Sequence, residues 1–107
     1  MSVLGELQPN KVFKYFEEIC SIPHGSRNLQ QISDYLVDFA KAHELKYRQD
    51  EDLNVIIWKD GSKGYEASEP VILQGHMDMV AVKEADCDKD MEKEGLDLEI
   101  NGDYILA

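Results

Sequence analysis

The sequence predicts an α/β protein in which two N-terminal helices are followed by a mixed sheet. Before residue 44, apolar residues recur at three- and four-residue intervals, which is the period of an amphipathic helix. Beyond that point they alternate with polar residues or form short runs, which is typical of strands. Turn-forming residues, Asp60–Gly64, indicate a flexible connection between two of the later segments.

The first helix is predicted from the start and stop signals around its apolar face. Pro9 stands near its beginning, where a missing N–H costs nothing. Pro23 follows its end, and because the residue before a proline resists helical geometry, Ser21 and Ile22 should leave the helix. The apolar face consists of Val12, Phe13, Phe16, Ile19 and Cys20.

A second helix is predicted over the next apolar stripe, with Ser26 or Asn28 as its N-cap. His43 lies near the end of this helix, where a positive imidazole suits the helix dipole. The stripe consists of Leu29, Ile32, Leu36, Phe39 and Ala40.

Four extended segments are predicted after the helices. Leu45–Gln49 alternates and Asn54–Trp58 is β-branched, so both should be strands. Val71–Leu73 is apolar without alternation, which favours a strand covered on both faces in the centre of a sheet. Leu96–Ile100 and Tyr104–Leu106 flank Asn101-Gly102, which is a strong hairpin signal.

The composition of the 107 residues limits the classes of function. The net charge of −11 argues against nucleic acids and anionic membrane surfaces as partners. No apolar run is long enough to span a membrane and no signal peptide is recognisable, so the cytoplasm is the expected location. Cys20 and Cys87 are therefore expected to be reduced. Glu84–Glu99 carries eight acidic residues and should be a solvated loop.

The end of the chain carries a prediction of its own. Natural chains seldom stop inside an apolar strand, because a terminus usually frays into polar residues. This sequence stops at Tyr104–Ala107, in such a strand. We therefore expect the 107 residues to be part of a longer protein.

The segment with the clearest chemical character is Val71–Val80, VILQGHMDMV. An apolar strand runs there into His76 and Asp78, whose spacing of two places both side chains on one side of an extended chain. A neutral imidazole can bind zinc while a carboxylate holds its other N–H. His76 is thus a candidate metal ligand and Asp78 its orienting partner.

Other interpretations of the polar residues stay open. His-x-Asp alone is a weak signal, and a catalytic zinc needs three protein ligands, of which the sequence offers no obvious others. His24, between Pro23 and Gly25, is better explained as a turn residue bonded to the backbone. The acidic loop has the spacing of a calcium-binding loop at Asp86, Asp88, Asp90 and Asp97, but Met91 stands where a glycine is needed.

Two motifs resemble those of a known family. Ile19–Ser26, ICSIPHGS, is similar to the N-terminal signature of the aminoacyl-histidine dipeptidases, also called peptidase D or cytosol non-specific dipeptidases. Val71–Val80 resembles the first metal motif of the same family, almost residue for residue. Asn54–Ile57 and Ile100–Asp103 also fall where that family has a strand and a hairpin, so the resemblance covers essentially the whole chain.

The resemblance implies a dipeptidase with two zinc ions, or manganese or cobalt in their place, that hydrolyses Xaa-His and other dipeptides. It implies that His76 is a zinc ligand and that Asp78 is the catalytic-site residue orienting it. Residues 1–107 would be the N-terminal part of the catalytic domain, inactive alone. The other ligands, the glutamate base and a lid or dimerisation domain would lie outside this chain, and the parent could be a homodimer. The alternative is a non-catalytic acidic α/β interaction module.

Overall fold

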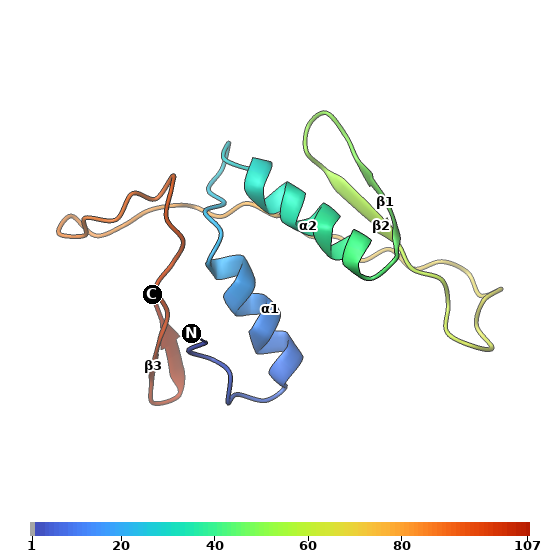
Figure 1. The fold of residues 1–107 in the computed structure, drawn as a ribbon, viewed down its shortest axis with the longest axis horizontal. Helices are drawn as coiled ribbons and strands as arrows, with labels where there is room; N and C mark the ends of the chain where they lie inside the picture. The colour runs from blue at the N-terminus through green and yellow to red at the C-terminus, as the bar shows by residue number, and fades with distance from the viewer. Residues whose placement is uncertain (1) are drawn as a thin grey trace. The chain divides into compact units, whose positions relative to one another are not determined.

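The computed structural model describes residues 2–107, which form two compact units. The first unit comprises the chain up to Ile32 together with Asp78–Ala107, and the second unit is Ser33–Met77. The elements follow the order of two helices and then four strands, so the predicted α/β class is confirmed (Figure 1). The strands form two separate two-stranded antiparallel sheets, one in each unit, and not the mixed sheet that was predicted. No helix among residues 2–107 is long and apolar enough to span a bilayer.

Helix α1, Asn10–Cys20, has the predicted bounds. Pro9 is its N-cap, and the side-chain oxygen of Gln8 accepts a hydrogen bond from the amide of Asn10 at 3.2 Å. This bond satisfies one of the amides that the first helical turn leaves without a partner. At the other end, the Ser21 hydroxyl donates to the carbonyl of Glu18 at 2.6 Å. Leu4 and Cys20 are buried and form part of the core of the first unit.

Helix α2, Gln30–Ala42, is also confirmed, but its predicted N-caps are wrong. The side chain of Ser26 binds Asp78, and that of Asn28 donates to the carbonyl of Glu92 at 2.9 Å. Both polar side chains therefore tie the loop before α2 to the segment that follows residue 77. The capping prediction failed because sequence spacing cannot distinguish a local partner from a distant one.

In the second unit, strands β1, Lys46–Gln49, and β2, Val55–Trp58, form the first hairpin. The side chain of Asp50 shapes the turn, because one carboxylate oxygen accepts the amides of Asp52 and Asn54 at 3.0 and 2.9 Å. These contacts, led by the bond from the Asn54 side chain, lower the pKa of Asp50 below its ordinary value. Both strands lie where the alternating and β-branched patterns predict them.

Ser33 joins α2 to this hairpin. Its hydroxyl is fully buried, donates to the carbonyl of Leu53 at 2.7 Å and accepts from the Gln49 side chain at 2.8 Å. Leu53 has a positive φ of 70°, which is unusual for a residue with a branched side chain. Val37 and Ala40 supply buried apolar side chains on the same helix. The second unit therefore combines apolar packing with a satisfied buried hydroxyl.

The predicted strand Val71–Leu73 is wrong for this structure. The three side chains are 84%, 87% and 94% exposed, and the segment has no strand conformation. Together with β2 it lines an open hollow of about 620 Å³, without forming a sheet ladder. A strand covered on both faces needs neighbouring strands and packed layers, and residues 2–107 supply neither to this segment.

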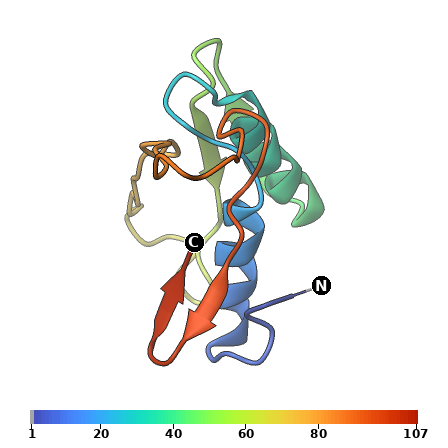
Figure 2. The same ribbon diagram turned by 90° about the vertical axis from the view of Figure 1, so that its left-hand side faces the viewer.

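In the first unit, β3, Glu99–Asn101, and β4, Tyr104–Leu106, form the predicted second hairpin (Figure 2). The register pairs Asn101 with Tyr104, so the two loop residues are Gly102 and Asp103. Gly102 has a φ of +61°, which a glycine adopts without strain. The Asn-Gly signal thus predicts the hairpin, although the turn lies one residue later than Asn101-Gly102.

Candidate functional site

The two motifs singled out in the sequence lie side by side in the first unit. The loop after α1 carries Pro23–Ser26, and the chain returns beside it at Asp78 and Met79. The amide of Met79 donates to the carbonyl of His24 at 3.0 Å, and the amide of Ser26 donates to the carbonyl of Met79 at 3.1 Å. These bonds form a parallel bridge between Gly25 and Met79. Segments more than fifty residues apart are therefore held in a fixed register.

Gly25 makes this close approach possible. A Cβ atom at position 25 would lie only 2.8 Å from the Cβ of Ala81, well inside van der Waals contact. Gly25 is buried, and its φ lies outside the left-handed region. Glycine is therefore needed at position 25 because the two segments lie too close together for a side chain.

Asp78 is anchored at this junction. Its Oδ2 accepts a hydrogen bond of 2.6 Å from the hydroxyl of Ser26. The Asp78 side chain is half-buried, whereas that of Ser26 is exposed. Hydrogen bonds to an ionised carboxylate are shorter and stronger than those between neutral groups. One carboxylate oxygen of the predicted orienting acid is thus bonded to a residue of the other motif.

His76 lies in the second unit, in the irregular segment that follows Val71–Leu73, and its side chain is exposed. The boundary between the units falls between Met77 and Asp78, so His76 and Asp78 belong to different units. An imidazole buried in the core would be unable to bind a metal. The exposure of His76 is compatible with the predicted role, which stays a prediction.

The residues present match zinc in donor type but not in number. His76 offers an imidazole and Asp78 a carboxylate, both ordinary zinc ligands. Among residues 2–107, however, no group of three or more His, Cys, Asp or Glu side chains is placed to hold a metal ion. A catalytic zinc takes three protein ligands. This part of the chain therefore does not build a complete metal site.

The other two histidines have structural contacts. His24 is 9% exposed, and its Nδ1 lies 2.6 Å from the carbonyl of Ile22, as expected for a turn residue bonded to the backbone. The Nδ1 of His43 lies 2.9 Å from the carbonyl of Phe39, and the two rings stack with their centroids 4.2 Å apart. Because a carbonyl only accepts, each Nδ1 is the donor in its contact. The turn interpretation of His24 is confirmed, and His43 lies at the end of α2 as predicted, whereas the predicted interaction of His43 with the helix dipole stays a prediction.

The two cysteines are free, as predicted. Cys20 is buried in the first unit, and its burial together with the nearby Glu17 raises the pKa of its thiol. Cys87 is partly exposed in the acidic loop. A raised thiol pKa makes Cys20 a poor nucleophile and a poor metal ligand at neutral pH.

The acidic segment Glu84–Glu99 is largely irregular, and all eight of its acids are exposed, so the predicted solvated loop is confirmed. Asp97, at the twelfth position of the calcium-like spacing, forms an ion pair with Lys89 at 2.7 Å. The same ammonium group donates to the carbonyl of Gly95 at 2.8 Å. Its bond to Asp97 raises the pKa of Lys89. The carboxylate of Asp97, which would be a calcium ligand in that interpretation, is thus paired with Lys89.

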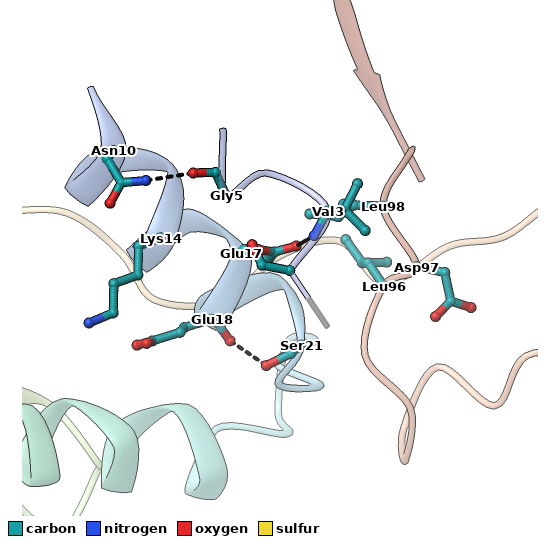
Figure 3. Close-up of a pocket in the computed structure, with 11 residues that line it drawn as sticks. Val3, Gly5, Asn10, Lys14, Glu17, Glu18, Ser21, Leu96, Asp97 and Leu98 are labelled. Atoms are coloured by element: carbon teal, nitrogen blue, oxygen red, sulfur yellow. Dashed lines mark hydrogen bonds between the residues drawn. The ribbon is translucent and has the colours of Figure 1, made fainter. Parts of the chain in front are cut away.

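A hollow of about 600 Å³ lies elsewhere in the first unit, between the N-terminal segment, α1 and the approach to β3 (Figure 3). Neither His76 nor Asp78 lines it. The carboxylate of Glu17 turns toward the N-terminal segment, accepting the Ser2 hydroxyl at 2.5 Å and the Val3 amide at 2.7 Å. These hydrogen bonds lower the pKa of Glu17. The carboxylate of Glu17 therefore connects the N-terminal segment to α1.

Sequence reasoning missed the contact between Ser26 and Asp78. The position of Ser26 before α2 predicts a helix cap, but its hydroxyl donates to Asp78 instead. No spacing rule connects residues 26 and 78, because their contact depends on the parallel bridge between Gly25 and Met79. The one available signal was that Ser26 ends the first of the two motifs.

Comparisons with known proteins agree with the two motifs. No family model matches the chain. Over all 107 residues it is 36% identical to the cytosol non-specific dipeptidase of Escherichia coli (strain K12), of which it covers 22%. Its fold matches the crystal structure of aminoacylhistidine dipeptidase from Vibrio alginolyticus with a TM-score of 0.90 and 34% identity. That match covers 97% of this chain and 21% of the Vibrio chain.

The chain therefore spans about a fifth of the length of the relatives it matches. Identity above 30% along the whole chain, combined with this agreement in fold, confirms the resemblance predicted from Ile19–Ser26 and Val71–Val80. The chain is thus similar in sequence over all 107 residues, and in fold over 97% of its length, to one part of these dipeptidases.

Proposed function

We propose that residues 1–107 are the N-terminal part of the catalytic domain of a metal-dependent dipeptidase. The observation that carries this proposal is the similarity along the whole chain to two proteins named as dipeptidases. The chain covers about a fifth of each. The rest of the catalytic domain, and a second domain forming a lid or dimer interface, would be supplied by residues outside this chain.

His76 is the proposed metal ligand of this part. Its exposed position supports the assignment, because an imidazole needs an open face to bind an ion. Zinc is the proposed metal, with manganese or cobalt as alternatives that also accept imidazole nitrogen. When bound as a pair in the complete protein, the ions would activate a water molecule and polarise the scissile carbonyl.

Asp78 is the proposed catalytic-site residue that orients His76. A carboxylate that accepts the second N–H of a metal-bound imidazole fixes the tautomer and makes the ring more basic. The anchored position of Asp78 supports this role, since an orienting group must itself be held.

Residues 1–107 alone are proposed to be inactive. They supply one imidazole and one carboxylate toward the metal, which is fewer than the three protein ligands of a catalytic zinc. They would also lack the glutamate base implied by the family resemblance. The proposed substrate is a dipeptide, including Xaa-His types, and the proposed location is the cytoplasm, in line with the name of the Escherichia coli relative.

The test uses the complete protein encoded by the gene that contains residues 1–107. Zinc-dependent hydrolysis of a dipeptide such as Ala-His is compared between the wild type and His76→Ala. His43→Ala is the matched control, because it removes an imidazole that packs on Phe39. The proposal predicts that His76→Ala abolishes turnover while His43→Ala retains it. Absence of dipeptidase activity in the complete wild-type protein would favour the non-catalytic interaction module.

A further inference from the structure

The hydroxyl of Ser26 donates a hydrogen bond to the carboxylate of Asp78. Its oxygen lies 2.6 Å from Oδ2, a distance characteristic of a hydroxyl bound to a carboxylate. Ser26 lies in the loop between α1 and α2, whereas Asp78 lies fifty-two positions further along the chain. The contact therefore connects the two motifs through their side chains.

The backbone on both sides of this contact is fixed. The amide of Ser26 donates to the carbonyl of Met79, the residue that follows Asp78, and the amide of Met79 donates to His24. The side chains of Ser26 and Asp78 thus start from two backbones held in one register. A hydroxyl presented in this way selects one orientation of the Asp78 carboxylate at little additional entropic cost.

The exposure of Ser26 argues against a packing role. Its side chain is exposed, while the neighbouring His24 and Gly25 are buried. Removal of one exposed oxygen atom creates no cavity, so the main loss would be the hydrogen bond itself. The same exposure leaves space for the additional methyl group of a threonine at this position.

We propose that Ser26 is a positioning residue that acts through Asp78: its hydroxyl holds the carboxylate in the orientation needed to align the His76 imidazole. This inference rests on the proposed function, because it assumes that His76 binds the metal. It goes further by assigning a role in the metal site to the loop after α1. Substitution of groups that orient metal ligands weakens metal affinity by roughly 10- to 100-fold.

The experiment measures zinc affinity of the complete protein by competition with a fluorescent chelator. Ser26→Ala is expected to weaken zinc binding about tenfold, at the lower end of that range, and to lower kcat with KM little changed. Ser26→Thr keeps the hydroxyl and should restore most of the affinity. Ser21→Ala is the matched control, because the exposed Ser21 hydroxyl also makes a 2.6 Å hydrogen bond, to the carbonyl of Glu18. It should leave zinc binding unchanged.

A second comparison tests whether Ser26 acts through Asp78. In an Asp78→Ala background, the additional change Ser26→Ala should alter zinc affinity by less than about twofold, because the carboxylate that it positions is gone. Circular dichroism and the protection of the Met79 amide establish that each variant is folded. A full tenfold effect of Ser26→Ala without Asp78 would overturn the proposal.

The outcomes separate this proposal from the proposed function. If His76→Ala weakens zinc binding but Ser26→Ala does not, the role of Ser26 is refuted and that of His76 stands. If Ser26→Thr is as defective as Ser26→Ala, the hydroxyl is not the active feature and the positioning role is refuted. If His76→Ala leaves zinc affinity unchanged, both proposals are overturned together.

Discussion

The contact between Gly25 and Ala81 gives the sharpest prediction about the junction that holds Asp78. Gly25→Ala would place a Cβ atom 2.8 Å from the Cβ of Ala81, a distance at which one backbone must move. The φ of Gly25 permits alanine, so the penalty comes from the contact alone. Overpacking of this kind costs about 1–3 kcal/mol of unfolding free energy.

The compensating change tests the reason for this cost. Ala81→Gly removes the opposing Cβ and by itself should cost less than about 1 kcal/mol, mainly through added freedom of the unfolded chain. In the double variant the overlap is absent, so the two changes should couple by at least about 1 kcal/mol. Gly75→Ala is the control: no atom lies within 4 Å of its added Cβ, so the change should stay within about 0.5 kcal/mol.

The assay is urea unfolding followed by far-UV circular dichroism, combined with hydrogen exchange at the amides of Ser26 and Met79, which form the bridge bonds. Gly25→Ala should lower the unfolding midpoint and speed exchange at both amides, and Ala81→Gly should reverse both effects. If Gly25→Ala is as stable as Gly75→Ala, or if Ala81→Gly gives no rescue, close packing of the two segments is not what holds this junction.

Three further predictions concern other contacts. Ser33→Ala should lower the unfolding free energy by about 1–3 kcal/mol in urea unfolding, because the carbonyl of Leu53 loses its buried donor; an unchanged midpoint would contradict this. Iodoacetamide should label Cys87 before Cys20, whose burial raises its thiol pKa, and equal rates by mass spectrometry would refute the assigned burial. The lowered pKa of Glu17 gives stability that is complete above the ordinary value of 4.5 and is lost as the pH falls through the lower folded value. In Glu17→Gln the unfolding midpoint should therefore fall less steeply as the pH is lowered. If the midpoint falls as steeply as in the wild type, Glu17 does not contribute to the loss of stability in acid.

The sequence predicted those elements whose signals are local. The apolar face between Pro9 and Pro23 predicts α1, and the turn around Gly102 predicts the second hairpin. Each depends on residues within a few positions of one another, where periodicity and turn chemistry act directly. The N-caps predicted for α2 are wrong because the contacts of these residues are not local. Ser26 and Asn28 bind partners more than fifty residues away.

The largest discrepancy, Val71–Leu73, has a different origin. Its apolar run is suited to a strand covered on both faces, but such a strand forms only when neighbours supply backbone partners and packed layers. Residues 2–107 supply none to this segment, whose side chains are 84% to 94% exposed. The apolar run therefore favours a strand that needs neighbouring strands, and residues 2–107 do not supply them.

The candidate site could be predicted in part. The spacing of His76 and Asp78 identified a possible ligand and its orienting acid from two positions in the sequence. The partner that anchors Asp78 could not be predicted, because the Ser26 contact arises from the parallel bridge at Met79. Long-range register of this kind is set by the fold, and no local pattern encodes it.

Anomalous diffraction at the zinc edge from crystals of the complete protein would show directly whether His76 binds the metal. If His76 binds zinc as proposed, a metal peak should lie about 2.0–2.1 Å from a ring nitrogen of His76, with Asp78 bonded to the other nitrogen and Ser26 bonded to Asp78. A zinc-loaded crystal with no metal peak at His76, or with its ring buried away from the metal, would refute the role of His76 as a metal ligand.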